Sequence, residues 1–213
     1  MKYKLIIFDW DGTLMDSADK IVECIQTAAK TLELPVPSAQ NARNIIGLSL
    51  APALRQLFCI ENDLAVEKLV KAYRSAFVGH VETSSPLFDG ALSLLETLKA
   101  RGHLLAVATG KGRPGLQGAW QHTKTAHYFH TSRCADDAQS KPSPDMLQQI
   151  LEELSLAPRQ ALMIGDTSYD MAMAESIGMD RVGVSFGVHK AEQLNKHKPL
   201  GIIDNLAELH GYL

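Results

Sequence analysis

The most informative part of the chain for its fold lies near the start and reads Lys4-Leu5-Ile6-Ile7-Phe8-Asp9-Trp10-Asp11-Gly12-Thr13-Leu14. Its apolar run predicts a buried strand, and two acidic residues, Asp9 and Asp11, stand at the carboxyl end of that strand. In an open parallel sheet, ligands bind beyond the carboxyl ends of the strands. Because two crowded carboxylates repel each other, this pair indicates a bound cation or a reaction rather than a stabilising turn.

The composition is that of a water-soluble globular protein. The 213 residues are 46% hydrophobic, which is enough for one large domain or for a core with a smaller appended domain. The formal net charge of -3 gives no indication of nucleic acid or of an anionic membrane surface as a partner. We find no secretory signal and no apolar run of membrane-spanning length, and the three cysteines form no CxxC pair. We therefore expect a cytoplasmic protein.

Helical periodicity follows the first strand as far as about residue 85, without a convincing strand. We expect one helix that starts near Ser17 and stops before Pro35, and a short one capped by Ser38. Two more follow, from about residue 49 and from a cap at Asn62. The segment Thr83-Ser84-Ser85-Pro86 is a candidate hinge. Residues 16–85 are therefore predicted to form a four-helix cap domain that lies over the strand ends.

The rest of the chain alternates helix and strand. Strands are expected at 104–108, 129–134, 161–164, 181–184 and 201–203, and helices at 90–101, 114–121, 144–154 and 168–177. This alternation predicts right-handed crossovers and an α/β fold with a doubly wound parallel sheet. The first strand must belong to the same sheet, so residues 1–15 and 86–213 are predicted to form the catalytic core.

Four stretches with chemically active side chains lie at predicted strand ends or in the loops that follow them. They contain Asp9 with Asp11, Thr109, Lys141, and Asp166 with Asp170. A fold of this kind brings such ends together. Carboxylates and other hard oxygen ligands suit Mg²⁺, whereas a lysine, a hydroxyl and free loop amides suit a phosphoryl group.

These stretches resemble the four signature regions of the haloacid dehalogenase superfamily, in the branch with a helical cap inserted after the first strand. The matching residues are Asp9-Trp10-Asp11-Gly12-Thr13, Thr109 after an apolar strand, Lys141 before Pro142, and Gly165-Asp166 with Asp170. The overall pattern is most similar to phosphoglycolate phosphatases and related small-molecule phosphatases. The resemblance covers almost the whole chain.

The resemblance implies roles for the two acids of the first stretch and for a metal. Asp9 would be the nucleophile that forms an aspartyl-phosphate, and Asp11 would act as general acid and then as general base. Mg²⁺ would be held by the Asp9 and Asp166 carboxylates together with the backbone carbonyl of Asp11.

The resemblance also implies the residues that hold the substrate. Thr109, Gly110 and Lys141 would bind the phosphate, and Lys141 would offset charge in the transition state. Asp170 would support these phosphate-binding residues indirectly, through a metal-bound water or by orienting Lys141.

The acid at position 11 favours an oxygen leaving group, and hence a phosphate ester or anhydride. We therefore expect a Mg²⁺-dependent phosphatase of small phosphorylated metabolites, with phosphoglycolate as the best candidate and with no nucleic-acid or membrane partner. Two alternatives stay open. A sugar phosphomutase would use the same pattern, and a signalling or binding module would be phosphorylated on Asp9 and keep the modification.

Several further residues have less decisive patterns. Strand alternation directs the Trp10 side chain away from the acids, so we expect it to pack in the core. Lys111 and Arg113, which follow Thr109, either add positive potential to the site or are only solvated, and we favour the solvated interpretation. In the cap, Arg43 and residues 47–49 are either substrate-selecting contacts, as the resemblance implies, or parts of a simple turn between helices.

Overall fold

The computed structural model describes residues 2–79 and 85–213, and over these residues six parallel strands form one sheet in the order β3-β2-β1-β4-β5-β6. The strands are β1 (Leu5–Phe8), β2 (Leu104–Ala108), β3 (Thr131–Arg133), β4 (Ala161–Gly165), β5 (Asp180–Val184) and β6 (Ile202–Ile203). A strand was predicted at each position, within two residues at most ends. The predicted α/β fold with a doubly wound parallel sheet is therefore confirmed.

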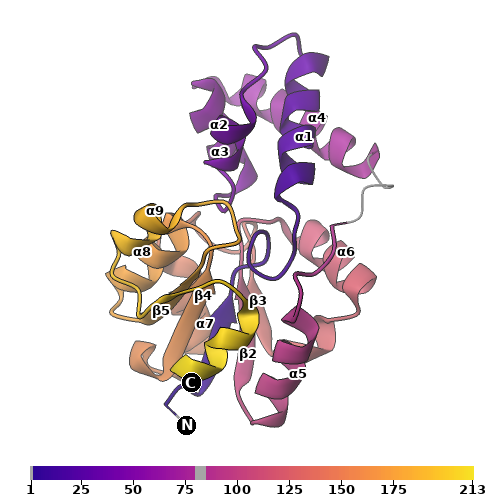
Figure 1. Ribbon diagram of the computed structural model, residues 1–213. Coiled ribbons are helices and arrows are strands. Elements are labelled where there is room, and N and C mark those ends of the chain that lie inside the picture. The colour runs from indigo at the N-terminus through magenta and orange to yellow at the C-terminus, as the bar shows by residue number, and fades with distance from the viewer. Residues whose placement is uncertain (1, 80–84) are drawn as a thin grey trace.

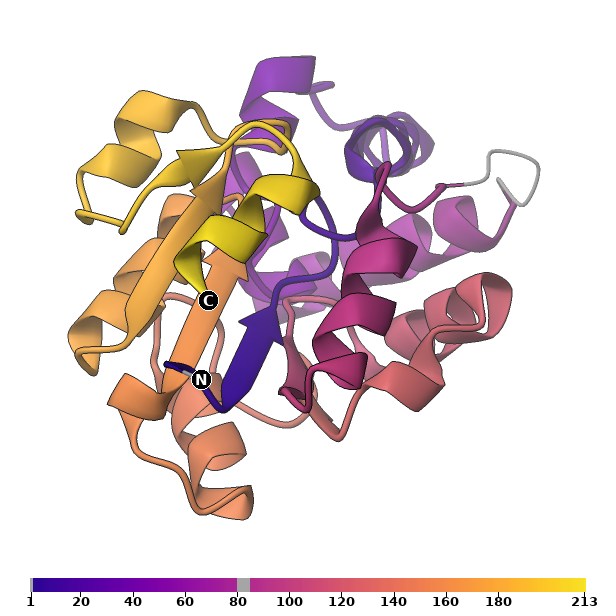
Figure 2. The same cartoon turned by 60° about the horizontal axis from the view of Figure 1, so that its bottom comes forward.

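The first strand lies in the middle of the sheet because β2 and β4 pair with its two edges. Its side chains alternate between two apolar layers. Ile6 and Phe8 pack with α5 (Ala91–Ala100) and α6 (Arg113–Thr123). Leu5 and Ile7 pack with α7 (Asp145–Glu153), and the same layer takes in α8 (Ser168–Ser176). Figure 2 shows α5 and the C-terminal helical turns on the near side of the strands. Both faces of the sheet are thus covered, and its carboxyl edge is left for ligands.

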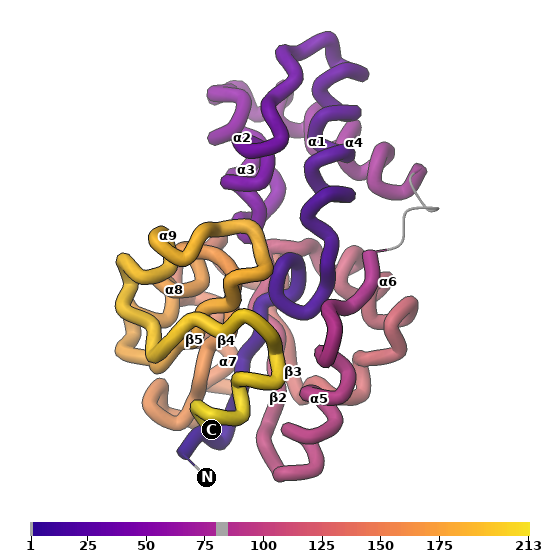
Figure 3. Tube along the Cα trace, in the orientation of Figure 1, coloured from indigo at the N-terminus to yellow at the C-terminus, as the bar shows by residue number. Residues whose placement is uncertain are grey.

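Between β1 and α5, the described residues form four helices that make a separate layer beyond that edge. They are α1 (Ala18–Thr31), α2 (Ala39–Arg43), α3 (Leu50–Phe58) and α4 (Asp63–Gly79). Their apolar faces form a cluster around Ile25, Leu54 and Leu69, which Val188 of the core also joins. Figures 1 and 3 show this layer as a lobe above the strand ends. We call these helices the cap. The candidate hinge at Thr83–Pro86 lies partly within residues 80–84, outside the described residues.

The caps of the helices follow the sequence signals. The Ser38 side chain accepts a hydrogen bond from the backbone N–H of Asn41, and the Asn62 side chain accepts one from Ala65. Short elements escaped prediction because three to seven residues carry no readable period: they are α9 (Ala191–Asn195) and 3₁₀ helices at Ala126–Tyr128, Pro158–Gln160 and Leu206–Tyr212. None of the described helices combines the length and the apolar character needed to cross a bilayer.

Candidate active site

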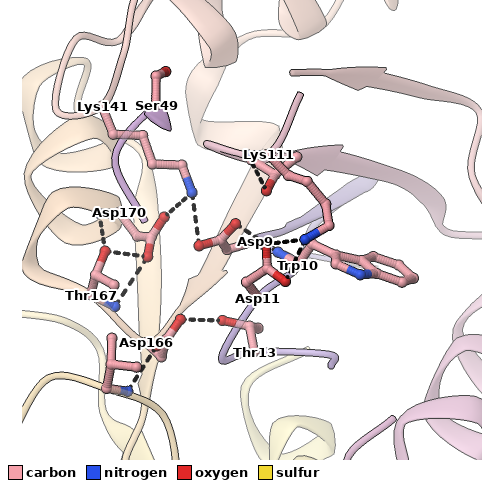
Figure 4. Close-up of polar contacts among 12 residues, drawn as sticks. Asp9, Trp10, Asp11, Thr13, Ser49, Lys111, Lys141, Asp166, Thr167 and Asp170 are labelled. Atoms are coloured by element: carbon pink, nitrogen blue, oxygen red, sulfur yellow. Dashed lines mark hydrogen bonds and ion pairs between the residues drawn. The ribbon is translucent and has the colours of Figure 1, made fainter. Parts of the chain in front are cut away.

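Asp9 lies at the centre of the carboxyl edge, directly after β1, and is only 1% exposed. Its Oδ1 accepts a hydrogen bond of 2.6 Å from the backbone N–H of Trp10, which holds the carboxylate in one orientation. Its Oδ2 lies 2.9 Å from Lys141 Nζ, and among the described residues this oxygen accepts no well-aligned hydrogen bond. Figure 4 shows Asp9 between Lys141 and Asp11. A buried oxygen with free lone pairs can attack phosphorus or bind a cation.

Lys141 supplies the nearest positive charge, and its side chain is completely buried. Its ammonium also pairs with Asp170 Oδ1 at 2.6 Å. Burial alone would lower the pKa of Lys141, but the negative charges of Asp170 and Asp9 outweigh that effect and raise it. The pKa of Asp9 is raised by burial and lowered in part by Lys141. Lys141 is therefore a fixed cation beside the candidate nucleophile.

Asp170 is oriented by the start of α8. Its Oδ2 accepts hydrogen bonds from the backbone N–H and the hydroxyl of Thr167, at 3.1 and 2.7 Å. The Thr167 hydroxyl in turn accepts one from the backbone N–H of Asp170. This reciprocal cap fixes the carboxylate, so that its other oxygen faces Lys141. Asp170 thus contacts Lys141 directly, which is one of the two roles expected for it.

Asp166 follows β4, and two glycines pack closely against its side chain. A Cβ at Gly12 or at Gly187 would overlap the Asp166 side chain, so both glycines are needed for this close approach. The carboxylate accepts hydrogen bonds of 2.9 Å from the Thr13 hydroxyl and from the backbone N–H of Val188. Burial, followed by the charge of Asp170, raises its pKa to about 7.

One carboxylate oxygen from each of Asp9, Asp166 and Asp170 lies within 4.8 Å of those from the other two, and all three residues are buried. Such a group is electrostatically unfavourable unless protons or cations compensate it. The donors are hard oxygens, and Asp9 Oδ2 is still available to a ligand. The residues present therefore fit a divalent cation of the Mg²⁺ type.

The side chain of Asp11 lies outside this cluster. Its two carboxylate oxygens lie 2.9 and 2.8 Å from Lys111 Nζ, and Oδ1 also accepts a hydrogen bond of 2.6 Å from the Ser17 hydroxyl. The metal ligand expected from this residue is its backbone carbonyl, which stays a prediction. The interpretation of Lys111 as solvated is wrong, because only 10% of its side chain is exposed. Its burial follows from the ion pair with Asp11, 100 positions away in sequence.

Thr109 and Gly110 follow β2 at the same edge. Thr109 is 1% exposed, and its hydroxyl accepts a hydrogen bond from the backbone N–H of Lys111. A Cβ at Gly110 would overlap the carbonyl oxygens of Gly47 and Leu48, so the cap turn packs directly on this glycine. The structure thus places the candidate phosphate-binding loop beneath the cap.

The cap turn also makes polar contacts with the core. The backbone N–H of Ser49 donates to the Ser140 hydroxyl at 2.9 Å, next to Lys141 in the chain. The Asn44 carbonyl accepts hydrogen bonds from the Tyr169 hydroxyl and from His189 Nε2, at 2.9 and 3.3 Å. His189 Nδ1 accepts from the backbone N–H of Ser168, which leaves the hydrogen on Nε2. Residues 44–49 therefore lie against the site.

The structure also shows the contacts of Trp10, Arg113 and Arg43, whose sequence patterns were less decisive. Trp10 is fully buried and makes edge-on contacts with Trp120 and Phe129, as its packing role requires. Arg113 is part-buried and pairs with Asp137. Arg43 pairs with Asp19 on the cap. The structure gives neither arginine a contact with the site residues.

Sequence reasoning missed several residues that shape the site. Thr13 ends the first motif and Ser17 follows it in the chain, so their hydroxyls could have been considered on that ground. Gly187 and Val188 carry no local signal, because their role depends on a loop after β5 that folds back onto Asp166. Only the tertiary structure identifies them.

The comparison with known proteins agrees with this arrangement. A family model described as haloacid dehalogenase-like hydrolase matches residues 6–184. The probable phosphatase IndB of Dickeya dadantii is 34% identical over 211 residues, which cover 97% of this chain and 92% of IndB. The pyrophosphatase PpaX of Bacillus cereus is 26% identical, with 98% of this chain and 95% of PpaX covered.

The solved structures include a close match in fold. The crystal structure of a predicted phosphoglycolate phosphatase from Haemophilus somnus aligns with a TM-score of 0.89 and 26% identity, covering all of this chain and 98% of the other. Relatives along the full length of the chain thus include phosphatases. From the family match, the relatives and the shared fold, the chain belongs to the haloacid dehalogenase-like hydrolase family.

Proposed function

We propose that this protein is a Mg²⁺-dependent phosphatase that hydrolyses small phosphate esters through an aspartyl-phosphate on Asp9. The observation that carries the proposal is the Asp9 Oδ2 atom, which is buried, accepts no aligned hydrogen bond among the described residues and lies 2.9 Å from Lys141 Nζ. Such an oxygen is positioned for nucleophilic attack with a neighbouring positive charge. The phosphatases among the full-length relatives support the same reaction class.

The reaction would proceed in two displacements. In the first, Asp9 Oδ2 forms a bond to phosphorus while the bond between phosphorus and the ester oxygen breaks, and Asp11 gives a proton to the departing oxygen. In the second, Asp11 takes a proton from a water molecule that attacks phosphorus, and the bond to Asp9 breaks. Free phosphate leaves, and both acids return to their starting states.

The other residues of the site would hold the transferred group. Thr109 and Gly110 offer a hydroxyl and a loop amide at the end of β2, and the Lys141 ammonium would stabilise charge on the phosphoryl oxygens. Asp170 would keep that ammonium in place through their contact of 2.6 Å.

Mg²⁺ would be held by Asp9, Asp166 and the backbone carbonyl of Asp11, and when bound it would offset the negative charge of the nucleophile and the phosphate. The close group of Asp9, Asp166 and Asp170 carboxylates supports this choice. The packing of the cap turn on Gly110 supports a small substrate, because a bulky polymer would meet the cap before it reached Asp9.

The test is phosphate release from a panel of monoesters with Mg²⁺ and with a chelator. We expect turnover that requires Mg²⁺ and that falls at least about 10³-fold in Asp9→Asn, since the nucleophile is lost. Asp89→Asn is the matched control, because Asp89 is exposed and outside the site. Wild-type turnover by Asp9→Asn would refute the covalent mechanism, and an isomerised sugar phosphate without free phosphate would indicate a mutase.

A further inference from the structure

Lys111 presents a positive charge to the site on the side of Asp9 opposite Lys141 (Figure 4). It lies in the loop between β2 and α6, two residues after Thr109, and its backbone N–H donates to the Thr109 hydroxyl at 3.2 Å. Its stem runs past Gly115, where an added Cβ would lie 3.0 Å from Lys111 Cγ. The loop therefore directs a single long side chain toward Asp11.

The ammonium of Lys111 is held from both the core and the cap. It pairs with both oxygens of Asp11, at 2.9 and 2.8 Å. It also lies 5.2 Å from the centre of the Phe77 ring, which belongs to the cap helix α4. With 10% of each side chain exposed, the pair between Lys111 and Asp11 is largely shielded from water.

This pairing conflicts with the role of Asp11 in the proposed reaction. Oδ1 is occupied by Ser17 and Lys111, and Oδ2 by Lys111. For Asp11 to exchange a proton with the departing ester oxygen, that oxygen must approach Asp11 Oδ2, where the Lys111 ammonium already lies 2.8 Å away. An ammonium that is shielded from water is costly without a negative partner. A negative charge on the departing part of the substrate would lie beside this ammonium and serve as a second partner for it.

We propose that Lys111 is a specificity-determining residue that selects substrates whose leaving group carries a second negative charge close to the ester oxygen. The substrate anion serves as a second partner of Lys111 and so frees Asp11 Oδ2 for proton transfer. A carboxylate and a second phosphate share this chemistry. The inference rests on the proposed phosphatase function and goes beyond it by naming what the leaving group must contain.

The experiment compares three substrates that differ in the leaving group: phosphoglycolate with a carboxylate, pyrophosphate with a phosphate, and 2-hydroxyethyl phosphate with no second charge. The value of kcat/KM is measured for the wild type, for Lys111→Met and for the control Lys124→Met, which removes an exposed lysine at the far end of α6. We expect Lys111→Met to lose at least about 30-fold on one or both anionic substrates. On 2-hydroxyethyl phosphate the change should stay below about 3-fold, and Lys124→Met should match the wild type.

The position of the loss identifies the anion: a loss on phosphoglycolate alone indicates a carboxylate, and a loss on pyrophosphate alone indicates a phosphate. An equal loss on all three substrates, or no loss on any, overturns the inference. If Lys111→Met fails to fold, the wild type still decides, because a higher kcat/KM for 2-hydroxyethyl phosphate than for both anionic substrates overturns it as well. Phosphate release by the wild type only from panel monoesters without a second negative charge overturns the inference as well, whereas release from no monoester of the panel would reject the proposed function instead.

Discussion

At the scale of single residues, the site carboxylates are all aspartates, and their surroundings make their chemistry differ. Asp166 and Asp11 are both acids at the same edge of the sheet, yet one lies in a group of carboxylates and the other against an ammonium. The pKa of Asp166 is raised from 3.8 to about 7, chiefly by burial. The folded, metal-free protein therefore binds this proton more tightly than the unfolded chain does.

This difference predicts the pH dependence of stability. The contribution from protonated Asp166 is fully present below about pH 4 and is lost as the pH rises through about 7, a span worth a few kcal/mol from the two pKa values. In a chelator, the free energy of unfolding should fall over this range in urea titrations. Mg²⁺ should restore more stability at pH 8 than at pH 5.

Asp166→Asn should remove much of this slope, because the side chain keeps its shape and no longer titrates. Asp204→Asn, at an exposed acid, should leave the slope as it is in the wild type. An unchanged slope in Asp166→Asn would show that burial of Asp166 does not control the pH dependence.

At the scale of elements, the loop after β2 and the turn before α3 must approach each other closely. Gly110 makes this possible, since a Cβ there would overlap the Gly47 and Leu48 carbonyl oxygens. The polar contacts of Asn44 and Ser49 hold the same turn against the core. Both elements are short, so their relative position depends on these contacts rather than on their own rigidity.

Gly110→Ala should therefore displace the cap turn and lower kcat/KM by about 10²-fold, because misplacement of a closing element by about 1 Å has effects of that size. Circular dichroism should show the sheet and helices intact. Gly118→Ala in α6 is the matched control: a Cβ there meets no atom within 4 Å. It should stabilise the protein by about 0.5–1 kcal/mol and leave kcat/KM unchanged. Wild-type kcat/KM in Gly110→Ala would show that catalysis does not need this contact.

At the scale of the whole molecule, the cap and the α/β core have apolar clusters of their own, and Val188 is the core residue among the buried members of the cap cluster. Leu54 and Leu69 belong to the cluster of the cap, whereas the apolar residues of β1 belong to the two layers around the sheet. The carboxylate group of Asp9, Asp166 and Asp170 comes entirely from the core. Metal binding and cap packing are thus expected to be separable.

Leu54→Ala tests this separation. Leu54 is fully buried, so its truncation should cost about 2–5 kcal/mol of cap stability and should reduce phosphate release. Calorimetric titration should show Mg²⁺ binding close to that of the wild type. Leu64→Ala, at a position that is 68% exposed on α4, should change stability by no more than about 0.5 kcal/mol. Loss of Mg²⁺ binding in Leu54→Ala would mean that the cap and the metal site are one unit.

Much of the fold was predictable because its signals are local. The strand Leu5–Phe8 is a continuous apolar run, and Ser38 and Asn62 mark helix starts with side chains that cap them. The candidate site was predictable to the extent that Asp9, Thr109, Lys141 and Asp166 each follow or border an element that ends at the same edge. Lys111 was misinterpreted because a lysine in a loop gives no sign of a partner 100 positions away.

Local sequence was enough to predict the alternation of elements, the position of the inserted helices and the acids at the strand ends, because each depends on neighbours within a few residues. Which charges meet depends instead on how the chain packs. The tertiary structure pairs Lys141 with Asp9 and Asp170, pairs Lys111 with Asp11, and closes Gly12 and Gly187 around Asp166. The physical reason is that charge interactions and burial depend on distance in space, which is set by how the sheet and the cap pack and cannot be read from spacing along the chain.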